Sequence, residues 1–341
     1  MASGSQVAAL TGISQLAEQE YLRLLQAPSA KAVEDRIVLC LNTALSEKEN
    51  PTSVPIRLST IADRFLINPN PKLIRGRYDG EIEFDESAGA FVITLCTDQP
   101  NMSFAKLGNR TRLRFTYAHE IAHRFFYVSV GTAWRRARDL ATERLRLPEQ
   151  MEQRITLGRL EERLCNKIAA RVLIPDSWIS NSCDLQEWFA DTERFCEKLS
   201  NQAKSLGVSR DCLMIRLRET ESRCRMGPNV AFLVGRSYGS INKRAAFTLR
   251  VLTALSPYQI DGCKLPAIYP GMEIERFGEI AAKVLCDLIN RANVQGTIHV
   301  PLWIDKSGKT IANLNGCWNL LSAGHTGGDD RILLWGKLTI N

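Results

Sequence analysis

Residues 113–127 read Leu-Arg-Phe-Thr-Tyr-Ala-His-Glu-Ile-Ala-His-Arg-Phe-Phe-Tyr, and this stretch is the most informative of the chain. Its apolar residues recur at helical spacing, which predicts an amphipathic helix with Thr116 as a cap near its start. His119 and His123 lie four residues apart, so their imidazoles point to the same side of that helix. Two imidazoles in this relation can hold a metal ion between them.

Glu120 lies between the two histidines and is placed to take a proton from a water held by such a metal. The chain has only four histidines, and two of them fall within this pentapeptide. The alternative interpretation is a coincidental pair of histidines on a helix. We favour a metal site, because a buried helix that carries two histidines and a glutamate needs partners for its polar groups.

A catalytic zinc site needs a third protein ligand and an open position for water. No other histidine lies close in the sequence, so we expect a carboxylate from a later helix. Residues 158–175 are the best candidate, with apolar residues at helical spacing and a proline at the end. We predict Glu162 as the third ligand and Asn166, one turn further, as the partner of a ligand histidine's ring N–H. The alternative is that Glu161 and Glu162 are both solvated charges on an exposed face.

Residues 112–123 and 162–175 resemble the two helical motifs of the ImmA/IrrE family of metallopeptidases. The first motif of that family is Arg-Phe-Thr-x-Ala-His-Glu-x-x-His. The second has the form Glu-x-x-Ala-Asn-x-Phe-Ala-Ala-x-Leu-Leu-x-Pro. The resemblance covers roughly residues 55–220 and implies a zincin-like fold for that part of the chain.

The resemblance also implies roles for individual residues. It places zinc ligands at His119, His123 and Glu162, with one zinc ion per chain, and a catalytic base at Glu120. The chain departs from the family pattern at Cys165, where alanine is usual. The linker between the two motifs is also longer than the family pattern leads us to expect.

The reaction that this arrangement predicts is zinc-assisted hydrolysis of a peptide bond. Glu120 would accept a proton from the zinc-bound water and pass it to the leaving amine. An oxyanion stabiliser is also needed. The candidates are Tyr127, Tyr117 and the arginines of residues 134–138, and the sequence does not choose among them.

The composition sets limits on the class of protein. With 341 residues, of which 45% are hydrophobic and 24% charged, the chain has an ordinary globular composition and room for two or three domains. It has no apolar run near the roughly 18 residues of a membrane span and no secretory signal pattern at its start. Its ten cysteines form no Cys-x-x-Cys pair, so we expect reduced thiols. Together these features predict a cytoplasmic protein without a membrane partner.

Positive charge is concentrated around the two motifs. The net charge is +7, and residues 104–171 hold 15 Lys/Arg against 7 Asp/Glu. The run 134–138, Trp-Arg-Arg-Ala-Arg, is the densest part, and near a cleft it could attract an acidic protein or a nucleic acid. The alternative, which we favour, is a solvated face with arginine stems packed flat. Residues 128–160 separate the two motifs and are a candidate lid or rim.

The first half of the chain divides into two expected parts. Residues 1–50 form an N-terminal helical extension, and residues 51–178 form the zincin-like core. Within the core, residues 78–84 and 90–96 predict a pair of strands with a short turn. The edge strand of a small sheet beside the active-site helix could hold an extended substrate peptide by backbone hydrogen bonds.

Residues 179–226 are expected to be helical, and residues 202–217 resemble a helix–turn–helix. Gly207 would make the turn, and Arg210 and Arg216 would lie on the second helix. The same pattern is common in plain helical packing units, which is the interpretation we favour. Direct contact with a nucleic acid therefore has weak support.

From residue 227 the sequence pattern changes to strand-like segments. It predicts a C-terminal α+β module over residues 227–341, with several strands and one long helix over residues 274–293. Some ImmA/IrrE proteins carry a GAF-like sensory domain at this end, so the resemblance offers that identity and a regulatory role. We expect His299 and His325 to be structural or surface residues, and residues 324–330 to be a loop. The fold class of the whole chain is therefore expected to be α+β.

Two functions fit these observations. The first, implied by the resemblance, is a zinc endopeptidase that cleaves a specific protein, a DNA-binding transcriptional repressor, in transcription regulation and stress response under control of the C-terminal module. The second is a non-proteolytic sensor or regulator that binds DNA or protein and in which the metal is structural. Loss of a co-expressed repressor that depends on Glu120 would separate the first from the second.

Overall fold

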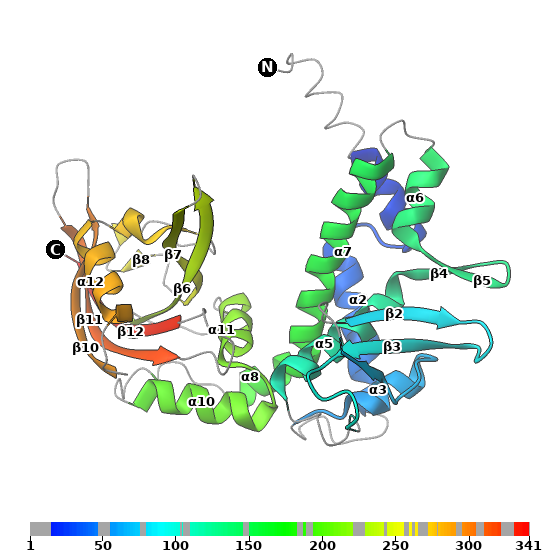
Figure 1. The fold of residues 1–341 in the computed structure, drawn as a ribbon, viewed down its shortest axis with the longest axis horizontal. Helices are drawn as coiled ribbons and strands as arrows, with labels where there is room; N and C mark the ends of the chain where they lie inside the picture. The colour runs from blue at the N-terminus through cyan, green and yellow to red at the C-terminus, as the bar shows by residue number, and fades with distance from the viewer. Residues whose placement is uncertain are drawn as a thin grey trace, which may run out of the picture. The chain divides into compact units, whose positions relative to one another are not determined.

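The structure is a computed structural model that describes residues 15–46, 55–75, 80–102, 104, 110–145, 150–182, 187–188, 194–220, 229–241, 244–255, 259–260, 263–264, 272–277, 279–290, 295–304, 310–321 and 331–340. Contacts divide the chain into two compact units (Figure 1). Unit 1 is Met1–Ser177 with Ser205–Val208, and unit 2 is Trp178–Lys204 with Ser209–Asn341. Both combine helices with sheet, which confirms the α+β class. Among the described helices, none combines the length and the apolar character needed to span a membrane.

Unit 1 contains a small three-stranded sheet. Its strands are β1 (Lys72–Ile74), β2 (Gly80–Asp85) and β3 (Ala90–Cys96), in the order β1-β3-β2. The antiparallel β2–β3 pair is the expected hairpin, and alternate residues of β3 are buried. The parallel strand β1 was not expected, because three residues carry too little periodicity to be recognised. Strand β2 forms one edge of the sheet.

The helices of unit 1 pack around one long helix (Figure 1). They are a helix over residues 15–24, α2 (Ala30–Ser46), α3 (Leu58–Arg64), α5 (Thr111–His123), α6 (Ala137–Leu145) and α7 (Gln150–Leu173). The long helix α7 contacts α2, α5 and α6. In the first helix, Tyr21 is fully buried and its ring stacks on Phe126 with centroids 6.3 Å apart. The N-terminal helices are therefore part of the core of unit 1.

The segment between the two motifs folds as a hairpin followed by a helix. Strands β4 (Tyr127–Val130) and β5 (Ala133–Arg136) pair antiparallel, and Gly131 adopts a positive φ of 63° at the turn. The ring of Trp134 lies 5.6 Å from that of Phe91, so the hairpin packs on the sheet. This hairpin and α6 account for the long linker.

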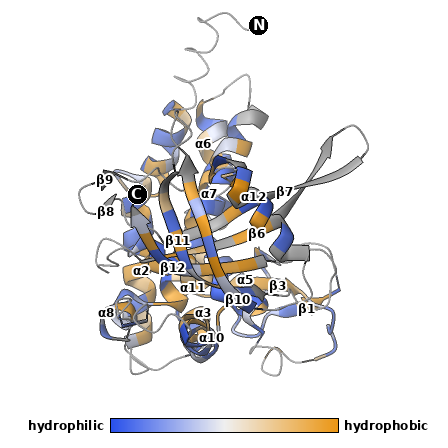
Figure 2. Ribbon diagram, turned by 90° about the vertical axis from the view of Figure 1, so that its left-hand side faces the viewer, coloured by the Kyte–Doolittle hydropathy of each residue, from blue (hydrophilic) through white to orange (hydrophobic). Residues whose placement is uncertain are grey.

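Unit 2 is built on a five-stranded antiparallel sheet in the order β10-β11-β12-β6-β7. The strands are β6 (Asn229–Ile241), β7 (Arg244–Leu255), β10 (Gln295–Ile304), β11 (Thr310–Leu321) and β12 (Arg331–Ile340), and a small pair adds β8 (Gln259–Ile260) and β9 (Cys263–Lys264). Hydrophobic and hydrophilic residues alternate along β10 and β11 (Figure 2). That alternation leaves one face of the sheet for an apolar core.

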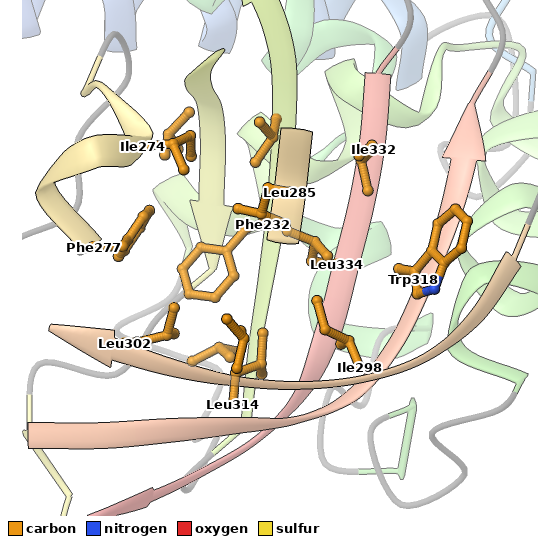
Figure 3. Close-up of a cluster of buried hydrophobic side chains, with 14 of the residues drawn as sticks. Phe232, Ile274, Phe277, Leu285, Ile298, Leu302, Leu314, Trp318, Ile332 and Leu334 are labelled. Atoms are coloured by element: carbon orange, nitrogen blue, oxygen red, sulfur yellow. The ribbon is translucent and has the colours of Figure 1, made fainter. Parts of the chain in front are cut away.

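The core of unit 2 is formed by the sheet and two short helical segments, η3 (Ile274–Phe277) and α12 (Glu279–Asn290) (Figure 3). Phe232 of β6 meets Phe277 edge to face, with ring centroids 5.7 Å apart, and Leu285 of α12 joins them. The single long helix expected over residues 274–293 is therefore wrong, because η3 and α12 are separate elements. Loop residues 324–330, with His325, lie outside the described residues.

Between residues 176 and 220, the part of the chain that the structure describes includes helices α8 (Asp176–Ser182), α10 (Phe195–Leu206) and α11 (Arg210–Glu219). Gly207 makes the turn between α10 and α11 with a positive φ of 66°. Ser209 caps α11 by accepting a hydrogen bond from the backbone N–H of Cys212. The two helices and the glycine turn that we expected are thus present.

Candidate metal centre

Helix α5 carries the two histidines of the HExxH sequence. It begins at Thr111, so Thr116 lies in its buried interior and is not the cap that we expected. His119 and His123 share one side of the helix, and their Nε2 atoms lie 3.0 Å apart. The four-residue spacing therefore places the imidazoles as predicted.

Helix α7 brings the third candidate ligand to the same point. Glu162 Oε2 lies 3.1 Å from Nε2 of His119, and its Oε1 lies 3.3 Å from Nε2 of His123. Ala169 and Ala170 are buried further along α7, where small side chains let two helices approach closely. The two histidines and the glutamate form a group that could hold a metal ion.

The donor atoms fit a divalent ion such as zinc. Ligands bonded to one tetrahedral zinc at about 2.0–2.1 Å lie about 3.3 Å from one another, close to the separations of 3.0–3.3 Å found here. Both Nδ1 atoms are already engaged, with Asn166 Oδ1 at 3.0 Å from His119 and Glu161 Oε1 at 2.9 Å from His123. An Nδ1–H that donates to oxygen leaves each Nε2 lone pair facing the other donors, and a cation relieves their repulsion.

His123 and Glu162 shift each other's pKa values. Hydrogen bonds from the two histidines hold the pKa of Glu162 well below its usual range. Burial alone would lower the pKa of His123, whereas the adjacent Cys165 thiol and two glutamate carboxylates raise it to about 12.

Glu120 lines a pocket of about 340 Å³ beside the three candidate ligands. Its side chain is buried, and burial raises its pKa above the usual value, an effect that the nearby histidines oppose. Edge strand β2 comes very close at Gly80, where a Cβ would lie 2.8 Å from Thr116 Cγ2 and 3.2 Å from Glu120 Oε1. Glycine at this position lets the sheet edge form one wall of the pocket.

The two tyrosines considered as oxyanion stabilisers do not line this pocket. Tyr117 is fully buried and its hydroxyl donates to Pro69 O at 3.1 Å, which does not favour this candidate. The Tyr127 hydroxyl donates to the backbone oxygen of Ile82 at 2.8 Å. The arginine run supplies the group that does reach the pocket, which is Arg136.

Arg136 is held by two contacts. Its Nε donates to the Tyr127 hydroxyl at 3.0 Å, and its Nη1 donates to Glu161 at 3.1 Å. Two other arginines of the hairpin region also pair with acids, Arg135 with Glu143 and Arg138 with Glu161. The basic run is therefore largely neutralised by ion pairs within unit 1.

Sequence reasoning missed Glu161. We considered it only as a solvated neighbour of Glu162, but its side chain is fully buried, whereas that of Glu162 is 51% exposed. A signal was available, because Glu161 shares a helical face with Leu164 and Ile168 at spacings of three and seven. Cys165 is also fully buried, and burial raises the pKa of its thiol to about 12.

Half of the second helix of the helix–turn–helix-like segment is buried. Five of its ten residues are buried, among them Arg216, which we expected to be available for DNA. Arg216 Nη1 lies 3.3 Å from Glu219 Oε2. A recognition helix must present its side chains to a groove, so the burial of α11 favours the packing interpretation.

The comparisons with known proteins add little. No family model matches the chain, and no curated protein matches it. Among solved structures, a Mycobacterium tuberculosis transcriptional regulator aligns with a TM-score of 0.43 and 13% identity, over 95% of this chain and 81% of its own. A similarity at this level carries no argument about function, so the resemblance to the ImmA/IrrE family stays a prediction from the two motifs.

Proposed function

We propose that the chain is a zinc-dependent endopeptidase. The observation that carries the proposal is the convergence of His119, His123 and Glu162 beside a pocket that also contains the buried carboxylate of Glu120. Structural zinc sites have four protein ligands, whereas catalytic sites have three and an open position. Among the described residues the group has three members, which supports a catalytic site over a structural one.

Zinc bound by these residues would supply an activated water and a Lewis acid for a carbonyl group. Glu120 supplies the base, because its carboxylate lines the same pocket and is shielded from solvent. Its raised pKa suits a group that accepts a proton from water and returns it to the leaving amine near neutral pH.

Arg136 supports the developing negative charge in this proposal. Its guanidinium lines the pocket and is oriented by Tyr127 and Glu161 before a substrate binds. A donor fixed in advance is effective at stabilising an oxyanion, because no reorganisation is needed during the reaction. Tyr127 therefore contributes through Arg136.

A protein segment in extended form suits the position of the pocket. Strand β2 ends the sheet on the pocket side, and its first residue, Gly80, lines the pocket. An extended peptide could add to this edge by backbone hydrogen bonds. The resemblance to the ImmA/IrrE family supports a DNA-binding repressor as the substrate and a regulatory role for unit 2, for which a GAF-like identity is part of the proposal.

Glu120→Gln tests the proposal. The variant should keep stoichiometric zinc and lose cleavage by about 10²–10⁴-fold, since the base is removed and the ligands are kept. The measurement is mass spectrometry of new protein termini when the chain is co-expressed with candidate repressors, together with metal analysis. Glu18→Gln, at an exposed residue of the first helix, is the matched control and should cleave normally. Cleavage by Glu120→Gln at the wild-type rate would show that the assigned base is wrong.

A further inference from the structure

The carboxylate of Glu161 lies behind the metal-binding group and is fully buried. Its Oε1 accepts from His123 Nδ1 at 2.9 Å and from Arg136 Nη1 at 3.1 Å. Its Oε2 accepts from the Tyr21 hydroxyl at 3.2 Å. Three elements, the N-terminal helix, α5 and the β4–β5 hairpin, thus meet on one side chain of α7.

We propose that Glu161 is a positioning residue of the metal centre, which fixes His123 with its Nε2 toward the other ligands and holds Arg136 at the pocket. The inference rests on the proposed metal site, although not on peptide hydrolysis. A carboxylate that accepts from the outer nitrogen of a ligand imidazole sets its tautomer and orientation and raises its basicity. Because one oxygen serves both His123 and Arg136, the metal ligand and the pocket arginine are positioned together.

The two histidines receive unequal support. His119 is paired with Asn166, a neutral amide on an exposed residue, whereas His123 is paired with a buried carboxylate. A hydrogen bond to a charged acceptor shielded from water is stronger than one to an exposed amide. Glu161 should therefore matter more to metal affinity than Asn166, although neither side chain belongs to the metal-binding group.

A purely structural role makes a different prediction. If Glu161 only neutralised Arg136, its loss would lower the stability of unit 1 and leave the metal affinity of the folded protein unchanged. Tyr21 provides a matched comparison, because Tyr21→Phe removes a hydrogen bond to Oε2 and leaves the contact between Oε1 and His123. The two roles are thus separable within the same buried cluster.

The test compares wild type, Glu161→Gln, Tyr21→Phe and Asn166→Ala in the full chain. Zinc affinity is measured by competition with a chromophoric chelator, and ligand geometry by the visible spectrum of the cobalt-substituted protein. Glu161→Gln should weaken zinc binding by about 10–100-fold and alter the cobalt spectrum. Tyr21→Phe should change affinity by less than about threefold, and Asn166→Ala should fall between the two.

Unchanged zinc affinity and an unchanged cobalt spectrum in folded Glu161→Gln would overturn the inference. If that variant does not fold, nitrogen and proton NMR of the zinc-loaded wild type tests the hydrogen bond between His123 and Glu161 instead. A slowly exchanging, downfield proton on His123 Nδ1 is expected, and its absence would equally overturn the inference. If the chain binds zinc in this way but cleaves nothing, the endopeptidase proposal fails and the positioning role stands.

Discussion

The two units of the chain bury different kinds of side chain. The described core of unit 2 includes a large cluster of apolar side chains, in which Phe232 and Leu334 of the sheet lie near Leu285 of α12 (Figure 3). Unit 1 buries charged groups beside its apolar core, including Glu120 and Glu161. Burying a charge carries a large free-energy cost unless the charge is paired. Apolar residues would have filled this space at a lower free-energy cost.

This difference shows which unit carries the polar groups suited to a reactive site. In unit 1 the buried polar groups converge on a pocket, and their partners are one another: His123 with Glu161, and Glu161 with Arg136. In unit 2 the buried Arg216 pairs with Glu219 on its own helix. Stability in unit 1 should therefore depend on metal and pH, whereas stability in unit 2 should depend on packing.

The largest expected effect is on packing in unit 2. Phe232→Ala removes a buried ring that meets Phe277, which should lower the stability of unit 2 by about 3–5 kcal/mol. Hydrogen exchange followed by mass spectrometry measures this effect unit by unit. Zinc affinity should not change, and Ile280→Ala, at a side chain that is 56% exposed, should stay within about 0.5 kcal/mol. A loss of zinc binding in Phe232→Ala would break the division between the units.

Metal should act on unit 1 alone. Zinc at about 100 times its dissociation constant should stabilise the unit that binds it by about 2.7 kcal/mol. The same hydrogen-exchange measurement, with and without a chelator, should show this gain in α5 and α7 and no gain in the sheet of unit 2. His123→Ala removes one ligand and should abolish the gain. An equal gain in both units would show that zinc acts elsewhere.

The sequence predicted those parts of the site that depend on local periodicity. The relation of His119 to His123 follows from helix geometry alone, and Glu162 was chosen because a later helix could supply a carboxylate. Which of two adjacent glutamates is buried depends on how α7 meets α5, and this is a tertiary property. The same holds for Tyr117, whose hydroxyl donates to the backbone oxygen of Pro69, a residue distant in the sequence.

Some errors came from weak local signals. Strand β1 pairs with β3 over three residues, too few for a pattern to show. The separation of η3 from α12 was hidden, because apolar residues continue at helical spacing through residues 274–290. The burial of α11 could not be foreseen from its turn and cap, since a packing pair and a DNA-reading pair share both features.

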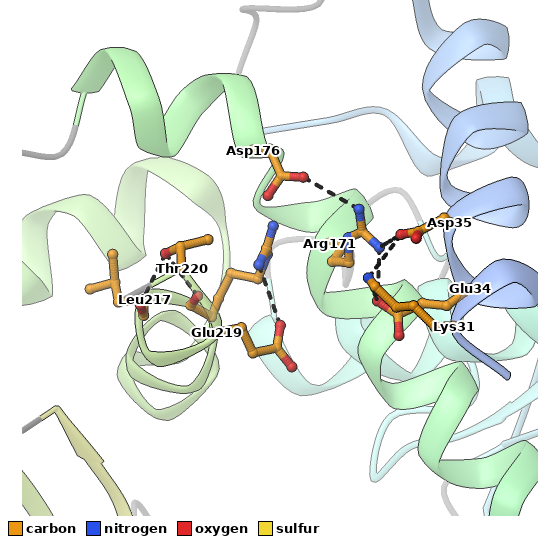
Figure 4. A network of polar contacts seen from close by, with 9 residues as sticks. Lys31, Glu34, Asp35, Arg171, Asp176, Leu217, Glu219 and Thr220 are labelled. Carbon is orange, nitrogen blue, oxygen red and sulfur yellow. Dashed lines mark hydrogen bonds and ion pairs between the residues drawn. The ribbon is translucent and has the colours of Figure 1, made fainter. Parts of the chain in front are cut away.

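The smallest expected effect concerns surface charge on unit 1. Arg171 of α7 reaches Asp35 at 2.6 Å and Glu34 at 2.8 Å, both on α2, and Asp176 at 3.4 Å (Figure 4). Lys31 also contacts Asp35, at 2.8 Å. Hydrogen bonds from Lys31 and Arg171 lower the pKa of Asp35, whose side chain is 49% exposed.

Asp35→Asn should therefore lower the stability of unit 1 by only about 0.2–1 kcal/mol at pH 7, because exposed ion pairs contribute little. A lowered folded-state pKa gives stability that is complete above the unfolded value of about 3.9 and is lost as the pH falls through the folded value. The difference between wild type and Asp35→Asn, followed by denaturant unfolding, should thus be constant from pH 5 to 7 and shrink below about pH 4. Phe232→Ala should show no such dependence, because its loss involves no proton. If the stability difference between wild type and Asp35→Asn grew as the pH fell, the ionised carboxylate of Asp35 would destabilise unit 1. The contrast between a charge-dependent unit 1 and a packing-dependent unit 2 would then be lost.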